Sequence, residues 1–456
     1  MFISLFRIDR PQLLAIGCGV ALLAAAARAS AGDAGAAAPR PSAVAAPPVE
    51  DLVARALAAA PSLAARRARI DAARLALRAA DAPADPMVEF EYRAANFPKW
   101  TVGSDPNSMI GASVRQPLLI GERKTARRTV AEADVGLRRA EEVESTASLA
   151  TAVRTTYAEV YAVDRERAIL ADSREIARLL SETAMARYSA GGSDQASVLR
   201  AQLEQTRLSQ RAVDLDARRA GLVASLNRLL NQPQETPFGE VGALPEPPPL
   251  SEALSRMPDL AADHAAGVAV RQADVAAAAR RVDAARAELQ PNFTVGGGLY
   301  WMGGADRLVT FSFGIEWPAR KARKQLPMLA ASERELEAAR RDLDDSAAAV
   351  REEAARTVSE IERDERQIEQ YRSGLLPQSS AAFDAVRAGY LVGRGDFSSV
   401  LDEFRQWTDA RVELAGFEAS RYAQRCRLDA LVNPPGPDGQ SPVGPTQTAA
   451  GKESQR

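Results

Sequence analysis

The residue types that carry most protein chemistry are scarce in this chain of 456 residues. It has one histidine, His264, and two cysteines, Cys18 and Cys426, which are too few for a zinc site, a disulfide framework or a Cys–His catalytic pair. The seven methionines are dispersed and form no thioether relay for soft metal ions. With no nucleophile–base pair and no phosphate loop, we expect no catalysis, no cofactor and no bound metal. His264 is expected on the surface of an alanine-rich helix.

Charged residues are abundant but balanced, with 58 Lys and Arg against 60 Asp and Glu and a net charge of −2. This balance excludes a polybasic nucleic-acid-binding protein and a disordered acidic tail. Hydrophobic residues reach 46%, but aromatic residues only 5%, because alanine supplies much of the apolar content. Such a composition favours long, closely packed helices over one large globular core.

The N-terminus has the parts of a secretory signal peptide. Arg7 and Arg10 precede an apolar run from Leu13 to Ala27, and small residues follow it. The run is short for a membrane-spanning helix. We therefore predict that residues 1–31 are a removed signal peptide.

Cys18 provides an alternative, because Ala15-Ile16-Gly17-Cys18 loosely resembles the lipobox of a bacterial lipoprotein. The apolar run continues beyond Cys18, and Ala15 is a poor first residue for a lipobox. The sequence thus favours cleavage over lipidation of Cys18. Cys426 would then be the remaining cysteine, and we predict that it packs on a helix as a small apolar residue.

The chain contains an internal duplication. At a shift of 202 positions Tyr188 falls on Tyr390 and Gly191 on Gly393, and further identities follow in the same register. This period is far too long for a solenoid repeat and indicates a duplicated domain. The expected segments after the signal peptide are a flexible leader (32–49), a first repeat (50–232), a proline-rich connector (233–249), a second repeat (250–433) and a disordered tail (434–456).

Each repeat contains a long helical hairpin. No proline occurs between Pro117 and Pro233, so the first hairpin is predicted over residues 122–230, with an outgoing helix on the order of 100 Å long. In the second repeat the hairpin is predicted over residues 320–432, with its turn at Gly393–Gly395. Helices of this length need partners along their sides, so both hairpins are expected to form coiled coils.

Four shorter segments alternate apolar and polar residues with the period of a strand. In the first, Val88, Phe90 and Tyr92 alternate with charged residues. Each segment has about nine residues, enough to cross an outer membrane when tilted. Two soluble β-hairpins packed against helices are the alternative that this pattern leaves open. The predicted strands are residues 87–95, 109–117, 292–301 and 308–317.

Strands in a bilayer would require an oligomer, because open sheet edges are not stable in lipid. Two copies would supply eight strands, and three would supply twelve with room for a water-filled pore. Three copies would also supply a ring of twelve long helices. A trimer is therefore the expected assembly.

The duplicated halves, paired strands, long hairpins and Tyr-x-x-Gly turns resemble the TolC family of outer-membrane efflux proteins over about residues 50–433. The resemblance implies a mainly α-helical fold with a membrane β-barrel part. Each duplicated protomer would give four strands to a shared 12-stranded barrel, and its hairpins would form a periplasmic α-barrel. The implied assembly is a homotrimer that docks with a periplasmic adaptor and an inner-membrane pump of the resistance-nodulation-division kind.

Two segments are similar to members of heavy-metal efflux systems, and they suggest heavy-metal cations as the cargo. One runs from Asp85 to Pro98 and the other from Gln116 to Lys124. This similarity concerns the substrate class alone.

The resemblance also implies a channel gate at the second-copy turn, where the residues that it indicates are Tyr390, Arg394 and Asp402. A ring of three Asp402 carboxylates would attract cations. Alternatively, Asp396 and Asp402 are acids that favour a helix N-terminus. We prefer this second interpretation for Asp396 and leave both open for Asp402.

The turns of both hairpins are expected to contact the adaptor. Their glycines permit a left-handed backbone. In the family an acid is often found where this chain has Ser197 and Ser399. The residues expected at the tips are Tyr188, Gly191, Gly192, Asp194, Gly393, Gly395 and Asp396.

Two other functions stay open at this point. The same fold could export an unfolded polypeptide as the duct of a type I secretion system. A periplasmic adaptor also carries a helical hairpin, but normally one, whereas this chain has two hairpins and four strands. The expected function is a passive exit duct.

Overall fold

The computed structural model describes residues 45–95, 98–102, 104–118, 121–249, 252–303 and 306–434. The chain divides into two units, Met1–Ala43 and Val44–Arg456, and the first unit lies wholly outside the described residues. The predicted signal peptide, Cys18 and the tail after residue 434 are therefore also outside the described part.

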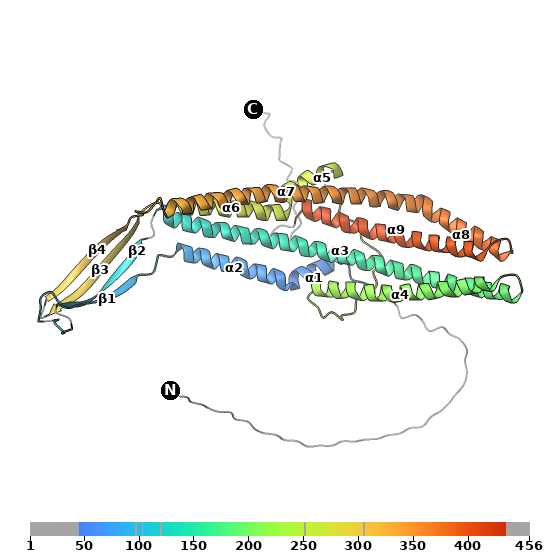
Figure 1. Cartoon of the computed structure of the whole chain (residues 1–456), viewed down its shortest axis with the longest axis horizontal. Coiled ribbons are helices and arrows are strands. Elements are labelled where there is room, and N and C mark those ends of the chain that lie inside the picture. The colour runs from blue at the N-terminus through green and yellow to red at the C-terminus, as the bar shows by residue number, and fades with distance from the viewer. Residues whose placement is uncertain are drawn as a thin grey trace, which may run out of the picture. The chain divides into compact units, whose positions relative to one another are not determined.

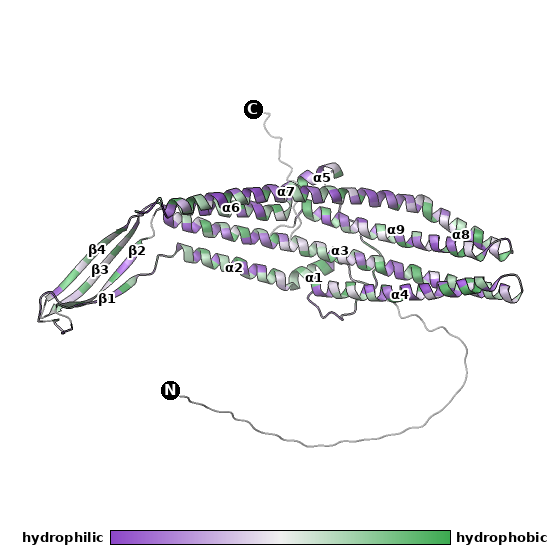
Figure 2. Cartoon of the chain, viewed as in Figure 1, coloured by the Kyte–Doolittle hydropathy of each residue, from purple (hydrophilic) through white to green (hydrophobic). Residues whose placement is uncertain are grey.

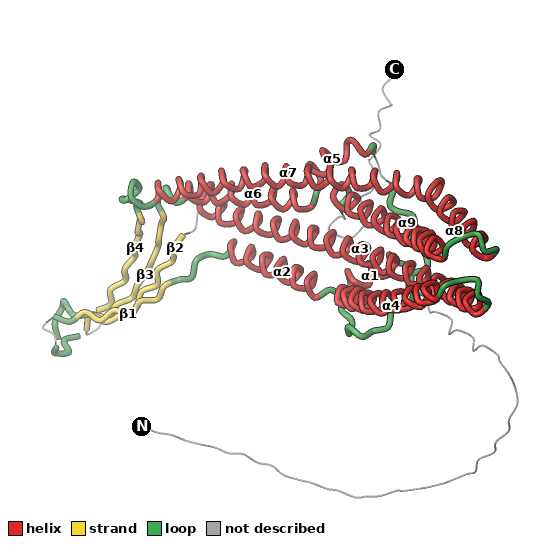
Figure 3. The backbone as a smooth tube through the Cα atoms, turned by 45° about the vertical axis from the view of Figure 1, so that its right-hand side comes forward, coloured by secondary structure: helices red, strands yellow, loops and turns green. Residues whose placement is uncertain are grey.

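Helices make up most of the second unit (Figure 1). Within it, α3 returns through α4, and α7 with α8 returns through α9. The four strands lie beside the ends of α2, α3, α6 and α7, away from the hairpin turns (Figure 3). The helices are α1 (Val49–Ala59), α2 (Pro61–Asp81), α3 (Glu122–Ser189), α4 (Gln195–Leu229), the 3-10 helix η1 (Leu254–Arg256), α5 (Met257–His264), α6 (Ala266–Ala287), α7 (Gln325–Gln370), the π-helix η2 (Tyr371–Leu375), α8 (Leu376–Leu391) and α9 (Phe397–Val432).

The outgoing arm of the second hairpin differs from the continuous helix expected from residue 320. α7 begins at Gln325, and the π-helix η2 separates it from α8. Pro377 explains the interruption, since it has no amide hydrogen for the carbonyl of Ser373 and its ring crowds that carbonyl. A local π turn widens the helix at this point and accommodates the ring.

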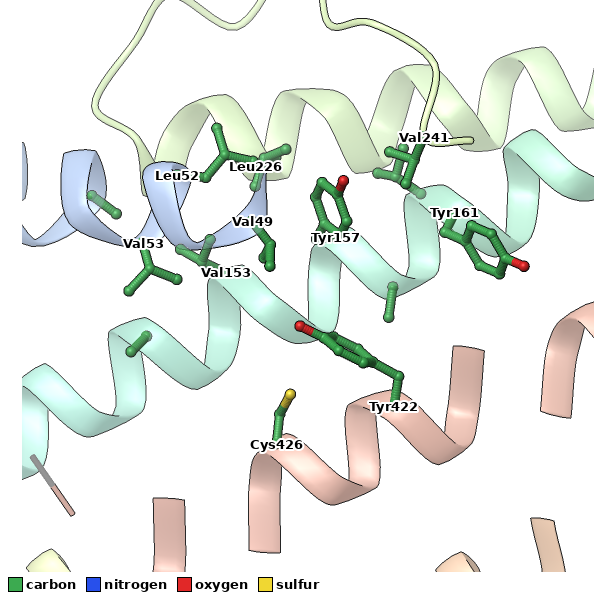
Figure 4. Close-up of a cluster of buried hydrophobic side chains, with 14 of the residues drawn as sticks. Val49, Leu52, Val53, Val153, Tyr157, Tyr161, Leu226, Val241, Tyr422 and Cys426 are labelled. Atoms are coloured by element: carbon green, nitrogen blue, oxygen red, sulfur yellow. The ribbon is translucent and has the colours of Figure 1, made fainter. Parts of the chain in front are cut away.

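A buried cluster joins α1, α3, α4 and α9 (Figure 4). Val153 and Leu226 are fully buried in it, and Cys426 is buried beside Tyr422. Burial raises the pKa of the Cys426 thiol to about 11. The prediction that Cys426 packs as a small apolar residue is confirmed. Along their length the long helices mix hydrophilic and hydrophobic residues (Figure 2), as expected for helices that bury one side only.

The connector after α4 is held by a buried acid on α3. Asp164, whose side chain is 4% exposed, accepts hydrogen bonds from Arg219 Nε at 2.6 Å and from the Val241 amide at 3.0 Å. Arg219 also donates to the Phe238 and Gly239 carbonyls at 3.2 and 2.9 Å. Neighbouring Glu240 pairs with Ala45 in a parallel bridge. The end of the expected leader, residues 45–49, is thus fastened to the helices.

The strands form one antiparallel sheet in the order β1-β2-β3-β4. Pairing across the two repeats occurs between β2 and β3. The strands are β1 (Met87–Arg93), β2 (Met109–Leu118), β3 (Asn292–Gly303) and β4 (Asp306–Glu316).

The register places the apolar residues of all four strands on one face. Phe90 lies opposite Ala112, which lies opposite Leu299, which lies opposite Val309. Phe90 is 84% exposed and Phe311 on the same face is 89% exposed. None of the described helices covers this face, which argues against two soluble β-hairpins packed on helices. None of the helices in the described residues is both long and apolar enough to cross a membrane.

The opposite face of the sheet is polar and closely packed. Arg115 on β2 pairs with Glu89 on β1 at 3.0 Å. The buried Tyr300 lies across two glycines, since a Cβ on Gly111 or Gly298 would come within 2.6 or 2.8 Å of its ring. Side chains at those two positions would displace Tyr300, so glycine is required there.

Candidate functional site

The two hairpin turns have the same backbone geometry. In the first, Gly191 has a φ of +74° and the Gly192 amide donates to the Arg187 carbonyl at 2.8 Å. In the second, Gly393 has a φ of +82° and the Arg394 amide donates to the Gly389 carbonyl at 2.9 Å. These bonds are those of a Schellman-type helix end, in which glycine takes the left-handed position. The internal duplication therefore extends to individual hydrogen bonds.

Arg187 of α3 joins the two turns. Its guanidinium donates to the carbonyl of Tyr390 at the end of α8 and, at 3.1 Å, to the carbonyl of Gly192 in its own turn. The guanidinium carbon lies 4.4 Å from the centroid of the Tyr390 ring. One side chain thus satisfies carbonyls of both hairpins and stacks on an aromatic ring between them.

Arg187 was not a candidate from the sequence, and its position gave little signal. At the shift of 202 it falls on Gly389, so the duplication does not draw attention to it. Gly389 lacks a side chain that could make the same contact. The link between the tips is therefore made by one copy only.

Tyr390 lies inside the protomer. It is buried against Phe397, with 5.3 Å between the ring centroids. Within the described residues its buried hydroxyl has no hydrogen-bond partner. A Cβ on Gly395 would lie 3.3 Å from the Tyr390 amide nitrogen, so the backbone passes close to this residue. Tyr390 thus positions the turn in this protomer, while Arg394 is exposed on the turn.

Asp402 lies on α9, more than one helical turn beyond the tip, and its side chain is 64% exposed. It pairs with Arg405 at 3.6 Å. Arg405 also donates from Nε at 2.9 Å to Glu204 of α4, whose side chain is only 6% exposed. The hydrogen bond to Glu204 is the main cause that raises the pKa of Arg405. Glu204, a buried acid of the first repeat that the sequence analysis missed, therefore pairs with the same arginine as Asp402.

The two acids that precede the returning helices differ. Asp194 caps α4, accepting from the Ser197 amide at 3.0 Å and from its hydroxyl at 2.5 Å. These hydrogen bonds, the hydroxyl first, lower the pKa of Asp194. Asp396 occupies the N-cap of α9, but its carboxylate accepts from the Ser398 hydroxyl and from no backbone amide. The expected N-terminal position of Asp396 is observed, without a backbone cap.

The tips also expose apolar side chains. Tyr188 at the end of α3 and Val392 after α8 are both exposed, as are Leu199 and Leu203 on α4. The turn residues of both hairpins thus lie together at one end of the helices, and Asp402 is set back along α9 (Figure 1). Across the described residues there is no group of three or more His, Cys, Asp or Glu side chains that could hold a metal ion. His264 is exposed, and its Nδ1 lies 3.0 Å from the Leu260 carbonyl oxygen.

Solved structures with this fold include outer-membrane proteins. The outer-membrane channel OprN matches with a TM-score of 0.73 at 17% identity, covering 84% of this chain and 89% of that chain. VceC from Vibrio cholerae matches with a TM-score of 0.72 at 15% identity, covering 84% and 95%. CusC matches with a TM-score of 0.70 at 16% identity, covering 84% of this chain and 91% of that chain. At these identities the likeness shows the fold alone. No curated protein matches the sequence.

The fold is the one that these outer-membrane proteins share. The sequence profile of outer membrane efflux proteins matches residues 52–232 and 250–433, so the chain belongs to this family. The two matched ranges lie on either side of the connector. The resemblance stated from the sequence is thus confirmed, and so is the location in the outer membrane.

Proposed function

We propose that three copies of this chain form one channel, the passive exit duct of a tripartite efflux system. The observation that carries the proposal is the sheet, which has one continuous exposed apolar face and two edges, β1 and β4. Among the described residues each edge strand pairs on one side only. Unpaired backbone groups cost several kcal/mol each in lipid. Pairing β1 of one copy with β4 of the next would close twelve strands around a pore.

In this assembly the helical hairpins form a periplasmic tunnel, and their tips form its entrance. Tyr390 and Arg394 lie at the tip, and three Asp402 carboxylates would line the channel behind it. The exposed Tyr188, Leu199 and Val392 offer apolar contacts to a periplasmic adaptor. An inner-membrane pump of the resistance-nodulation-division kind would supply the energy for transport.

Heavy-metal cations are the proposed cargo class. The support is the similarity of two segments to heavy-metal efflux members. Gln116 Nε2 donates to the Ala84 carbonyl at 2.5 Å, beside Asp85. Asn96, Phe97, Leu119 and Ile120, which belong to the same segments, lie outside the described residues.

The assembly is tested by light scattering on protein extracted from membranes with detergent. We expect a particle of three protomers that separates on heating. Protein that is monomeric and water-soluble without detergent would refute the channel.

A matched pair of variants tests which face of the sheet meets lipid. Phe311→Lys places a charge on the apolar face, which costs about 2–4 kcal/mol near the bilayer midplane, and should reduce the amount of inserted trimer. Ser312→Lys places the same charge on the polar face and should be tolerated. Equal insertion of both variants would contradict the assignment of the faces.

The cargo is tested in a deletion strain grown on a panel of metals and drugs. Increased sensitivity to metal cations, restored by the wild-type gene, would support the proposal. A strain that keeps its resistance but no longer secretes a polypeptide would point to type I secretion instead.

A further inference from the structure

The segment that joins β4 to α7 carries a dense group of cations. Arg320, Lys321, Arg323 and Lys324 lie within five positions, and we call these four residues the basic collar. Most arginines of the described helices are paired with acids, but no carboxylate of the described residues lies within ion-pair distance of the collar. This group of unpaired positive charge stands out in a chain whose net charge is −2.

The collar follows directly after the exposed apolar face of the sheet. β4 ends at Glu316, and Trp317 beyond it is 65% exposed. Lys321 places its ammonium 5.4 Å from the centroid of the Trp317 ring. A tryptophan followed by lysines and arginines is the arrangement found at the headgroup level of membrane proteins, where cations reach out from the apolar layer.

Hydrogen-bonded turns hold the collar in a defined conformation. The amides of Arg323 and Lys324 donate to the Arg320 carbonyl at 3.0 and 3.1 Å, and the Leu326 amide donates to the Lys321 carbonyl at 2.9 Å. The four side chains therefore extend from a segment whose backbone is already folded. Little backbone entropy would be lost when an anion binds there.

A cavity of about 480 Å³ opens beside the collar, between α3, α6 and the start of α7. Arg320 and Lys324 line it together with Trp317, Arg123 and the carboxylates of Glu288 and Glu316. Arg123 is already engaged, because it donates to the Gln290 carbonyl at 2.7 Å and pairs with Glu288 at 3.4 Å. Arg320 and Lys324 are thus the cations of the cavity that remain for a ligand.

Among the residues that the structure describes, the other end of the sheet has no comparable group. There Arg93 pairs with Glu91 at 2.9 Å, and the loop after β1 carries Lys99 and Asp105, which have opposite charges. The cations at that end are Arg93, Lys99 and Arg307, which do not form a dense group, so the cluster of four cations lies at the end of the sheet that meets the helices.

The geometry points to a binding site for the headgroup of an anionic phospholipid, in which the basic collar holds the phosphate and Trp317 lies against the start of the acyl chains. This inference rests on the proposed function, because it requires the apolar face of the sheet to lie in a bilayer. The site would fix the depth of the channel at the leaflet that faces the periplasm. Juxtamembrane lysines and arginines each favour an anionic membrane surface about fivefold.

The test uses the full-length protein, extracted and exchanged into detergent with equal amounts of phosphatidylglycerol and phosphatidylcholine. Native mass spectrometry then counts the lipids that stay bound. We expect the wild-type protein to retain phosphatidylglycerol preferentially. A variant with all four collar residues changed to glutamine should lose this preference by at least about tenfold.

Two matched variants control for charge and for folding. Replacing each collar arginine by lysine and each collar lysine by arginine keeps the charge and should keep the preference for phosphatidylglycerol. Changing Arg69, Arg218, Arg228 and Arg271 to glutamine removes four exposed cations that also have no ion pair in the described residues, and it should change nothing.

The inference is overturned if the wild type shows no preference, or if the glutamine variant keeps it. Displacement of phosphatidylglycerol by millimolar inorganic phosphate would also overturn it, because the site would then bind any phosphate. These outcomes leave the channel intact as long as the protein inserts as a trimer. Failure of the wild type to insert would instead refute the proposed function.

Discussion

The contact between the hairpin tips can be broken with one substitution. Arg187→Met keeps a long side chain but removes the guanidinium that bonds to the Tyr390 and Gly192 carbonyls and stacks on the Tyr390 ring. A hydrogen bond to a charged group contributes about 1.5–3 kcal/mol, and an exposed cation–π contact about 0.5–1 kcal/mol. The bond to the Gly192 carbonyl stays within the first turn, so one hydrogen bond and the ring contact reach the second turn. Because Arg187 is half-buried, we take the lower ends of both ranges and expect a loss of about 2 kcal/mol there.

That loss should appear as local opening of the second turn. The amides of Gly393 and Arg394 donate to carbonyls at the end of α8 and exchange with solvent only when the turn opens. A change of about 2 kcal/mol corresponds to about 30-fold faster exchange of these two amides. Hydrogen exchange measured by mass spectrometry on peptides covering the turn gives this rate directly.

The matched control is Arg178→Met, also on α3. Among the described residues Arg178 pairs with Glu175 and Glu182 of its own helix, so its loss should leave the second turn unchanged. Unchanged exchange at Gly393 and Arg394 in Arg187→Met would refute the conclusion that Arg187 holds the tips together.

Three further predictions concern single residues. Asp402→Ala should lower the cation preference of the reconstituted channel. The matched control, Asp344→Ala, breaks an ion pair on α7 with the same residue spacing and the same length of 3.6 Å, and it should leave the cation preference unchanged. An unchanged reversal potential of Asp402→Ala in a salt gradient would contradict a role for Asp402. Asp164→Ala leaves the guanidinium of Arg219 without its acid and should cost about 3–5 kcal/mol of stability. The loss should appear as a lower melting temperature in detergent. An unchanged melting temperature would show that Asp164 does not hold the connector. Because its pKa is raised to about 11, the Cys426 thiol should react with iodoacetamide at pH 8 more than about 100-fold more slowly in the folded than in the unfolded protein. A similar rate in both states would contradict its burial.

Much of the secondary structure could be predicted from local patterns. The outgoing helix of the hairpin expected over 122–230 corresponds to α3, Glu122–Ser189, because no proline or glycine pair interrupts that stretch. The expected strand over 109–117 corresponds to β2, Met109–Leu118, because apolar and polar residues alternate there with the two-residue period of a strand. The interruption at η2 was missed, since a single proline predicts a kink but not how the backbone absorbs it.

The candidate site was only partly predictable. The glycines of both turns follow from local sequence, and the structure places them as a pattern of helix ends requires. Asp194, expected at a tip, is the residue that caps α4. Arg187 and Glu204 were missed, because each acts on a residue about 200 positions away. Asp402 was identified by resemblance, but its shared cation, Arg405, was not.

The sequence alone determined the periods of the elements, their lengths, the duplication and one apolar face for each strand. All of these depend on residues a few positions apart, or on comparing one half with the other. Only the tertiary structure decided that the four faces align in one sheet, that Arg187 bonds to Tyr390, and that Glu204 and Asp402 share Arg405. Each further residue turns a helix by about 100°, so a shift of one residue between two long helices would separate these partners. Which side chains meet across the hairpins is therefore set by the packing of whole helices.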